Sequence, residues 1–268
     1  MNVYNISLYG LRLLDVTIFI PYALIWLAGF YGFARLKSYS SIIKRSNDGK
    51  QINRLANGVL LLALWLPVSS IVNNLFIFFS NSHPSMVPVG VIVSNYLNLA
   101  LPLAGFILIG LGVRGLNGLT KLRPSFWVIN GLVLSLILLS SGYGYLLSTV
   151  SDLGGVYHLH GSLVLTTLAV PYVFMWCVGV MATYGLYLYQ KNVVGIVYRR
   201  SWRLLFLGVA ATIILQVVLQ YFSAFAVHLH DLSVEVVFII AYLLLVLLSV
   251  GYILIARGAK TLQKIEEV

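Results

Sequence analysis

Residues 55–113 read LANGVLLLALWLPVSSIVNNLFIFFSNSHPSMVPVGVIVSNYLNLALPLAGFILIGLGV, a stretch without Asp, Glu, Lys or Arg. A helix needs about 20 mostly apolar residues to cross the roughly 30 Å hydrocarbon core of a bilayer. The stretch is therefore long enough for two crossings, and the polar run Asn81-Ser82-His83-Pro84 indicates the turn between them. We predict a helical hairpin that spans a membrane.

The rest of the chain has the same character. Of its 268 residues, 60% are hydrophobic and only 9% are charged, whereas a soluble domain carries about a quarter charged residues. In lipid the backbone must satisfy its own hydrogen bonds, so apolar runs of this length form helices. We predict an all-α, polytopic bundle of seven transmembrane helices, a single membrane domain over residues 1–268, in the cell membrane. The predicted spans are 16–36, 55–79, 89–113, 125–148, 162–190, 204–226 and 235–256.

The basic residues predict how the chain is oriented. Lys and Arg concentrate in cytoplasmic loops, and all 17 of them except Arg12 fall on one face of the seven-span topology. This face is predicted to be cytoplasmic, which leaves the N-terminus outside and the C-terminus inside. Topology thereby explains the net charge of +10, so the lipid bilayer is the expected partner and nucleic acid is not.

The sequence also repeats itself at a fixed spacing, which indicates an internal duplication. The segment Pro21–Gly29 (PYALIWLAG) recurs 150 residues later as Pro171–Gly179 (PYVFMWCVG). Further matches at spacings of 150 or 146 residues are Leu55 with Leu205, Gly58 with Gly208, Tyr96 with Tyr242, and Gly105 with Gly251. We predict three-helix repeats at 16–116 and 162–262. They run parallel through the membrane because a linker helix at 125–148 restores the direction of the chain.

This 3+1+3 arrangement resembles the SWEET sugar carriers and the wider PQ-loop group, and it is similar to the layout proposed for microbial rhodopsins. The resemblance covers most of the chain and is one of architecture. The sequence contains no Pro-Gln dipeptide, and span 235–256 has no lysine that could carry retinal. SWEETs are expected to carry an asparagine on the third and seventh helices, whereas here Asn95 and Asn98 have no counterpart on the seventh. The resemblance implies the fold and, as an expectation, transport.

Several aromatic and amide side chains lie inside the predicted spans. Trp26 and Trp176 fall near the middle of theirs, although tryptophan is usually found at membrane interfaces. They can line a central pocket or simply pack between helices. The amides are those of Asn73, Asn74, Asn98, Gln216 and Gln220. Together these residues are the candidate site for a neutral polar solute such as a sugar or an amino acid. Alternatively, the amides join helices, which is worth about 0.6–2 kcal/mol for each hydrogen bond.

Two prolines precede the two tryptophans by about one and a half helical turns. Pro21 and Pro171 each remove a backbone hydrogen bond and should kink their helices. We predict that they form a matched pair of hinges, the alternative being that they only shape the bundle.

Two His-x-His pairs lie at the outer ends of predicted spans. His158 with His160, and His228 with His230, would each present two imidazoles on one face of an extended segment. Such a pair can bind zinc or copper, and it can equally face lipid headgroups and water. No other cofactor is expected.

Three classes of function fit these features. The sequence has no nucleophile–base pair, no paired carboxylates at depth and no phosphate-binding glycine loop, so we expect no enzymatic activity. No charged residue lies well inside any span, which argues against a proton pump or a voltage sensor. A carrier for a small neutral solute is the leading prediction. A seven-helix sensor or signal transducer that uses the 37–54 loop, and an accessory structural subunit of a membrane complex, are the alternatives.

Overall fold

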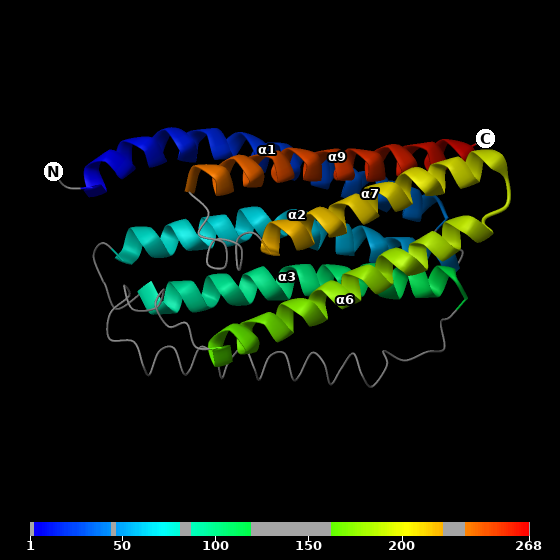
Figure 1. Cartoon of the computed structure of the whole chain (residues 1–268). Helices are drawn as coiled ribbons and strands as arrows, with labels where there is room; N and C mark the ends of the chain where they lie inside the picture. The colour runs from blue at the N-terminus through cyan, green and yellow to red at the C-terminus, as the bar shows by residue number, and fades with distance from the viewer. Residues whose placement is uncertain (1–2, 44–46, 81–86, 119–161, 222–233, 268) are drawn as a thin grey trace.

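A computed structural model describes residues 3–43, 47–80, 87–118, 162–221 and 234–267 (Figure 1). All of the regular structure in these residues is helical. The described helices are α1 (Val3–Ile42), α2 (Asn47–Ser80), α3 (Val87–Leu116), α6 (Ser162–Asn192), α7 (Ile196–Tyr221) and α9 (Val234–Glu266). They coincide with six of the predicted spans. The predicted linker helix at 125–148 lies outside the described residues.

Most of the helices extend past the predicted spans at the end where the charges lie. The prediction for the last span stopped at residue 256, whereas α9 continues to Glu266, and α7 begins at Ile196 rather than at residue 204. Hydropathy marks where the hydrocarbon core ends, but the backbone remains helical in the headgroup region. Basic side chains in a last turn favour this, because they interact with the negative end of the helix dipole, as Arg114 does in α3 and Lys264 in α9.

The six helices form a closed ring. Going round it, α1 packs on α2, α2 on α3, α3 on α6, α6 on α7, α7 on α9, and α9 again on α1. At one end the Tyr198 hydroxyl donates to Glu266 Oε1 over 2.6 Å, and Asn117 Nδ2 donates to the Gly185 carbonyl oxygen over 3.1 Å. These bonds bring the C-terminal ends of α3, α6 and α9 to the N-terminal end of α7. Helices α1, α3, α6 and α9 therefore run toward this end, and α2 and α7 run away from it.

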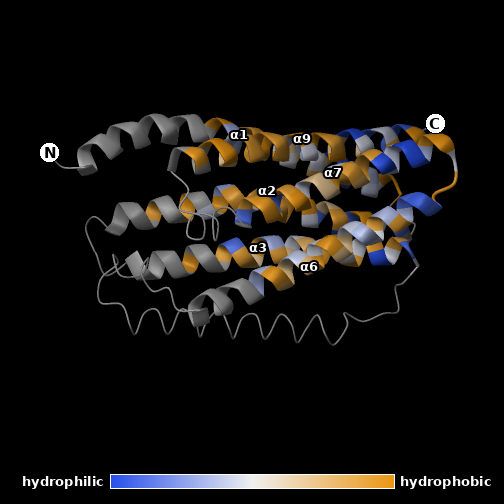
Figure 2. Ribbon diagram, in the orientation of Figure 1, coloured by the Kyte–Doolittle hydropathy of each residue, from blue (hydrophilic) through white to orange (hydrophobic). Residues whose placement is uncertain are grey.

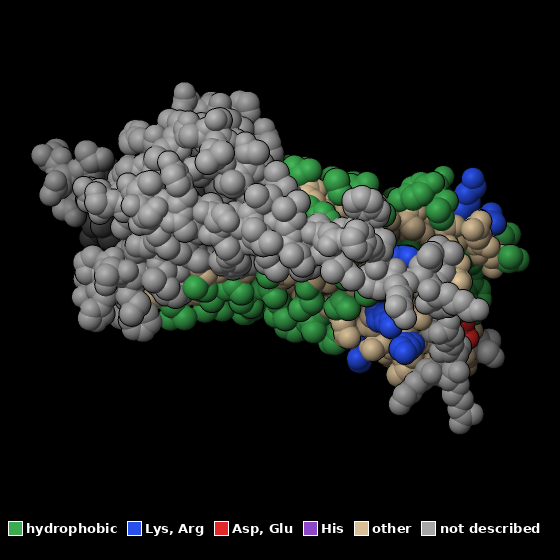
Figure 3. Space-filling view, turned by 90° about the horizontal axis from the view of Figure 1, so that it is seen from below, with side chains coloured by type: hydrophobic (Ala, Val, Ile, Leu, Met, Phe, Trp, Pro, Cys, Tyr) green, Lys and Arg blue, Asp and Glu red, His purple; other side chains and the backbone are tan. Residues whose placement is uncertain are grey.

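Basic side chains gather at this end, which we call the basic end. Lys37 Nζ donates to Asn53 Oδ1 there, between the end of α1 and the start of α2. Figure 2 shows the hydrophilic residues of the described helices concentrated at the same end, and Figure 3 shows Lys and Arg there. The described basic residues at this end are Arg35, Lys37, Lys50, Arg54, Arg114, Lys191, Arg199, Arg200, Arg203, Arg257, Lys260 and Lys264.

The flanks of the bundle expose large apolar side chains rather than polar ones. Leu27, Met181 and Ile239 are 70%, 69% and 62% exposed. Five of the described helices are long and apolar enough to cross a bilayer, over Asp48–Ser69, Leu97–Leu116, Pro171–Asn192, Ile196–Gln220 and Ile239–Glu266. Soluble monomers rarely expose so much contiguous apolar surface. The helices fit a multi-pass membrane protein whose apolar flanks face lipid.

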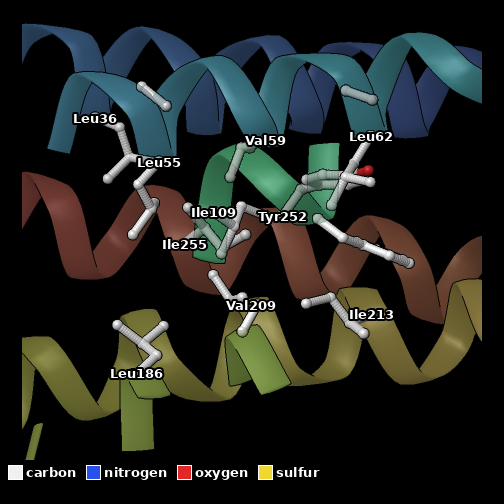
Figure 4. Close-up of a cluster of buried hydrophobic side chains, with 14 of the residues drawn as sticks. Leu36, Leu55, Val59, Leu62, Ile109, Leu186, Val209, Ile213, Tyr252 and Ile255 are labelled. Atoms are coloured by element: carbon white, nitrogen blue, oxygen red, sulfur yellow. The ribbon is translucent and has the colours of Figure 1, made fainter. Parts of the chain in front are cut away.

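The interior of the ring is filled by branched apolar side chains. Val59, Ile109, Val209 and Ile255 come from four helices, point toward one another, and are at most 1% exposed (Figure 4). Glycines let the helices approach closely at this level. A Cβ atom added to Gly58 of α2 would lie 2.7 Å from the Gly105 carbonyl oxygen of α3. We call this region, from the centre of the bundle to the basic end, the glycine-packed half.

Candidate functional site: a buried polar layer

Polar side chains from five helices meet in the interior, next to the glycine-packed half and on its side away from the basic end. We call this group the polar layer. Its members are Trp65 of α2, Asn98 of α3, Trp176 of α6, Gln216 and Gln220 of α7, and Tyr252 of α9. Trp65 and Tyr252 belong to the apolar core, and Trp176 packs against it.

Gln216 joins three helices in the middle of the ring. Its side chain is 0% exposed, and its Nε2 donates to the Leu62 carbonyl oxygen of α2 over 3.2 Å. The same Nε2 lies 3.3 Å from the Tyr252 hydroxyl of α9. Because α2 and α7 are not neighbours in the ring, the bond to Leu62 crosses its interior. The amide oxygen, Oε1, is buried and has no hydrogen-bond partner among the described residues.

Gln220 lies one turn further along α7 and makes a second set of bonds. Its Oε1 accepts from Trp176 Nε1 over 3.0 Å, and its Nε2 donates to the Asn98 carbonyl oxygen over 3.3 Å. That carbonyl would normally accept from the backbone four residues later in α3. This position is Pro102, which has no N–H to donate. The proline therefore frees the acceptor that Gln220 uses across the ring.

Asn98 extends this second set to α2. Its Oδ1 accepts from Trp65 Nε1 over 3.0 Å. Asn98 and Gln220 together thus connect α2, α3, α6 and α7 through hydrogen bonds between uncharged groups. Amides and indoles buried in a bilayer are costly unless they are paired, which explains why these partners are matched.

The two tryptophans of the repeated segment differ in their partners. Trp176 Nε1 is bonded to Gln220, and its ring lies 6.2 Å from that of Tyr172. Trp26 Nε1 is buried and has no partner among the described residues, and the same holds for the Ser69 hydroxyl. Residue 70 stands 150 positions before Gln220 and is a serine. At this matched position the first half of the chain thus has no amide.

The other predicted site residues are less informative. Pro21 and Pro171 are buried inside α1 and α6, which continue through them, so a hinge role stays a prediction. Asn73 and Asn74 lie in α2, but their side chains are outside the described part of the structure. The four histidines also lie outside it. No group of three or more potential metal-ligating residues occurs in the described ranges, so the zinc or copper site stays a prediction.

Sequence reasoning missed two members of the polar layer, Trp65 and Tyr252. A signal for the second was present in the repeat, because Tyr252 stands where Phe106 stands 146 residues earlier. The two rings fill matching positions, and both are 0% exposed. Only the tyrosine carries a hydroxyl, and it faces Gln216, which stands 150 residues after Leu66, the other spacing of the repeat. Polar replacements at matched apolar positions would have identified this part of the layer.

The polar layer offers hydrogen-bond donors and acceptors without formal charge. Such groups can bind a neutral polar molecule but give no strong site for an ion. No protein-family model matches the chain, and no curated protein or solved structure is significantly similar to it.

Proposed function

We propose that the chain is a seven-span carrier for a small neutral polar solute, and that the solute binds at the polar layer. The observation that carries the proposal is Gln216 Oε1, a buried acceptor in the polar layer that has no hydrogen-bond partner among the described residues. A buried polar group without a partner costs about 1–3 kcal/mol, so a ligand that donates a hydrogen bond to this oxygen would recover that free energy.

The repeat gives a physical basis for transport. A Cβ atom on Gly58 would lie 2.7 Å from the Gly105 carbonyl oxygen, and one on Gly208 would lie 2.7 Å from that of Gly251. Gly208 follows Gly58 by 150 residues and Gly251 follows Gly105 by 146, which are the spacings of the predicted duplication. Equivalent helices thus make equivalent contacts in 16–116 and 162–262, which supports two units of one architecture. In carriers of this type, one unit rocks against the other around a central site.

The directions of the helices support an odd number of crossings. Helix α3 ends at the basic end, whereas α6 begins at the opposite end. A linker helix at 125–148, as predicted, would join these two ends. If the basic end is cytoplasmic, as the distribution of Lys and Arg favours, the N-terminus is outside and the C-terminus is inside.

Packing indicates the side from which the solute would enter. From the polar layer to the basic end, the axis is filled by side chains such as Val59 and Ile255, which are 0% exposed. We propose that this end is closed in the present conformation and that the solute reaches Gln216 from the opposite side. Release to the cytoplasm would require the two units to separate at the glycine-packed half.

A ligand screen tests the proposal. Sugars, polyols and neutral amino acids would be added to the detergent-purified protein, and its thermal unfolding recorded. A ligand at 100 times its Kd stabilises the folded state by about 2.7 kcal/mol. We expect Gln216→Leu to abolish the shift, and Gln263→Leu, the same change at the basic end, to retain it. The proposal fails if no solute stabilises the protein, or if both variants respond alike.

Transport assays then separate the alternatives. A solute that binds should also exchange across proteoliposome membranes if the protein is a carrier. Binding without exchange would favour the sensor, in which case deletion within 37–54 should abolish signalling. Neither binding nor exchange would favour the accessory subunit.

A further inference from the structure

The hairpin that joins α6 to α7 ends in exposed apolar side chains. Val194 and Ile196 are each 88% exposed and Val197 is 57% exposed; we call these three residues the apolar tip. The turn itself is well bonded. Gly195 has a φ of 97°. The backbone N–H of Arg199 donates to the Gly195 carbonyl oxygen over 2.9 Å, and its side-chain Nε donates to the Val193 carbonyl oxygen over 3.3 Å. The tip is thus held in place by its own hairpin.

Positive charge surrounds the apolar tip. The segment 191–203 contains no Asp or Glu and four basic residues, all of them exposed: Lys191, Arg199, Arg200 and Arg203. The acidic side chain bonded to this segment is Glu266, which accepts from the Tyr198 hydroxyl. The tip therefore combines apolar side chains with a positive local field.

The other hairpin at the basic end is mostly polar in sequence. A hairpin at this end therefore does not need apolar residues in order to form. Residues 43–47 join α1 to α2 and read IKRSN, whereas residues 193–197 read VVGIV. Both segments connect neighbouring helices of the ring at the same end. Where the second segment has Val194, Ile196 and Val197, the first has Lys44, Ser46 and Asn47. A binding role explains this difference better than folding does.

The tip lies at the depth of lipid headgroups. Along α6 the lipid-facing apolar side chains continue to Leu188, and Lys191 is the first charge after it. Helix α6 ends at Asn192, four residues beyond Leu188, or about 6 Å at 1.5 Å per residue, and the apolar tip follows directly. The headgroup layer on each side of a bilayer is roughly 5–8 Å thick. Segments with apolar and basic side chains bind in this layer, with the apolar groups directed toward the acyl chains.

We propose that the hairpin tip binds anionic phospholipid headgroups of the leaflet at the basic end. Lys191, Arg200 and Arg203 meet the phosphates, and the apolar tip inserts between the headgroups. Charge complementarity and depth favour this partner over a soluble protein. The inference does not depend on the proposed carrier activity, because it concerns the lipid-facing rim of the bundle.

A fluorescent probe on the tip tests the proposal in the full chain. Val194→Cys in a Cys177→Ser background would be labelled with a dye sensitive to polarity and placed in nanodiscs of phosphatidylcholine, with and without phosphatidylglycerol. We expect a blue shift of the emission only with phosphatidylglycerol, reversed by high salt because salt screens surface charge.

Matched variants identify the source of the shift. Removal of two charges by Arg200→Ser and Arg203→Ser should largely abolish it, whereas Lys260→Ser and Lys264→Ser, which remove equal charge from α9, should leave it. Ile196→Ser should weaken the shift, and Ile239→Ser, on a distant flank, should not. The proposal is overturned if the shift is equal in both lipids, if both charge pairs reduce it equally, or if it appears only when soluble protein is added.

Discussion

The glycine-packed half and the polar layer join the same helices by different means. Near the basic end, backbones touch: Gly58 faces the Gly105 carbonyl, and Gly208 faces that of Gly251. In the polar layer, long amide side chains bridge the interior, as Gln220 does to Asn98. Contacts between backbones leave no freedom, whereas a hydrogen bond within a membrane is worth only about 0.6–2 kcal/mol and can exchange partners. The difference suggests that rearrangement begins in the polar layer.

The largest effect should come from filling a backbone contact in the glycine-packed half. A Cβ atom on Gly208 would lie 2.6 Å from the Ile255 nitrogen and 2.7 Å from the Gly251 carbonyl oxygen. Because neither is a flexible side chain, α7 and α9 must separate. We expect Gly208→Ala to destabilise the protein by about 1–3 kcal/mol or more. Gly58→Ala should cost a similar amount, and denaturant unfolding in detergent measures both.

Gly110→Ala is the control for this prediction. The nearest atom to a Cβ at Gly110 is the Ala182 Cβ, at an ordinary 3.7 Å. Alanine favours a helix over glycine by about 0.8–1 kcal/mol, so this variant should be neutral or slightly more stable. An equal loss at positions 110 and 208 would mean that the close contacts do not hold this half together.

Loss of one amide from the polar layer should have a smaller effect, and the two glutamines should differ. Gln220→Leu leaves Trp176 Nε1 and the Asn98 carbonyl without their bonds, and we expect it to cost about 1–2 kcal/mol. Gln216→Leu also removes an unpartnered oxygen and should cost less. Denaturant unfolding in detergent measures the stability loss of each variant and so ranks the two. A double-mutant cycle with Trp176→Phe should recover the Trp176–Gln220 coupling, and a zero coupling would argue against that bond.

The smallest effect is expected at Pro102. Pro102→Ala restores an N–H that can bond to the Asn98 carbonyl within α3, at the expense of the bond from Gln220. The two changes should nearly cancel, with a net effect below about 1 kcal/mol. The informative measurement is Gln220→Leu in this background, which should cost less than in the wild type. An unchanged cost would show that the proline does not provide the acceptor.

Part of this architecture could be read from the sequence alone. Apolar runs of about 20 residues located all six described helices, because crossing a bilayer depends on local composition and length. Gln216 and Gln220 were predicted to lie inside a span as site residues, and both are buried in the ring. The ends of α7 and α9 were misplaced, since a helix continues into the headgroup region after the hydropathy falls. Trp65 and Tyr252 were missed because each resembles an ordinary apolar residue until its partner is known.

The sequence by itself determined that the chain forms long apolar helices with their basic residues at one end, since both properties belong to contiguous segments. Only the tertiary structure decided which polar groups meet. Gln216 bonds to Leu62 and Gln220 to Asn98, across 154 and 122 residues of sequence. Such pairs arise from how the ring closes and from a carbonyl that a proline frees on another helix, and neither is encoded within a single span.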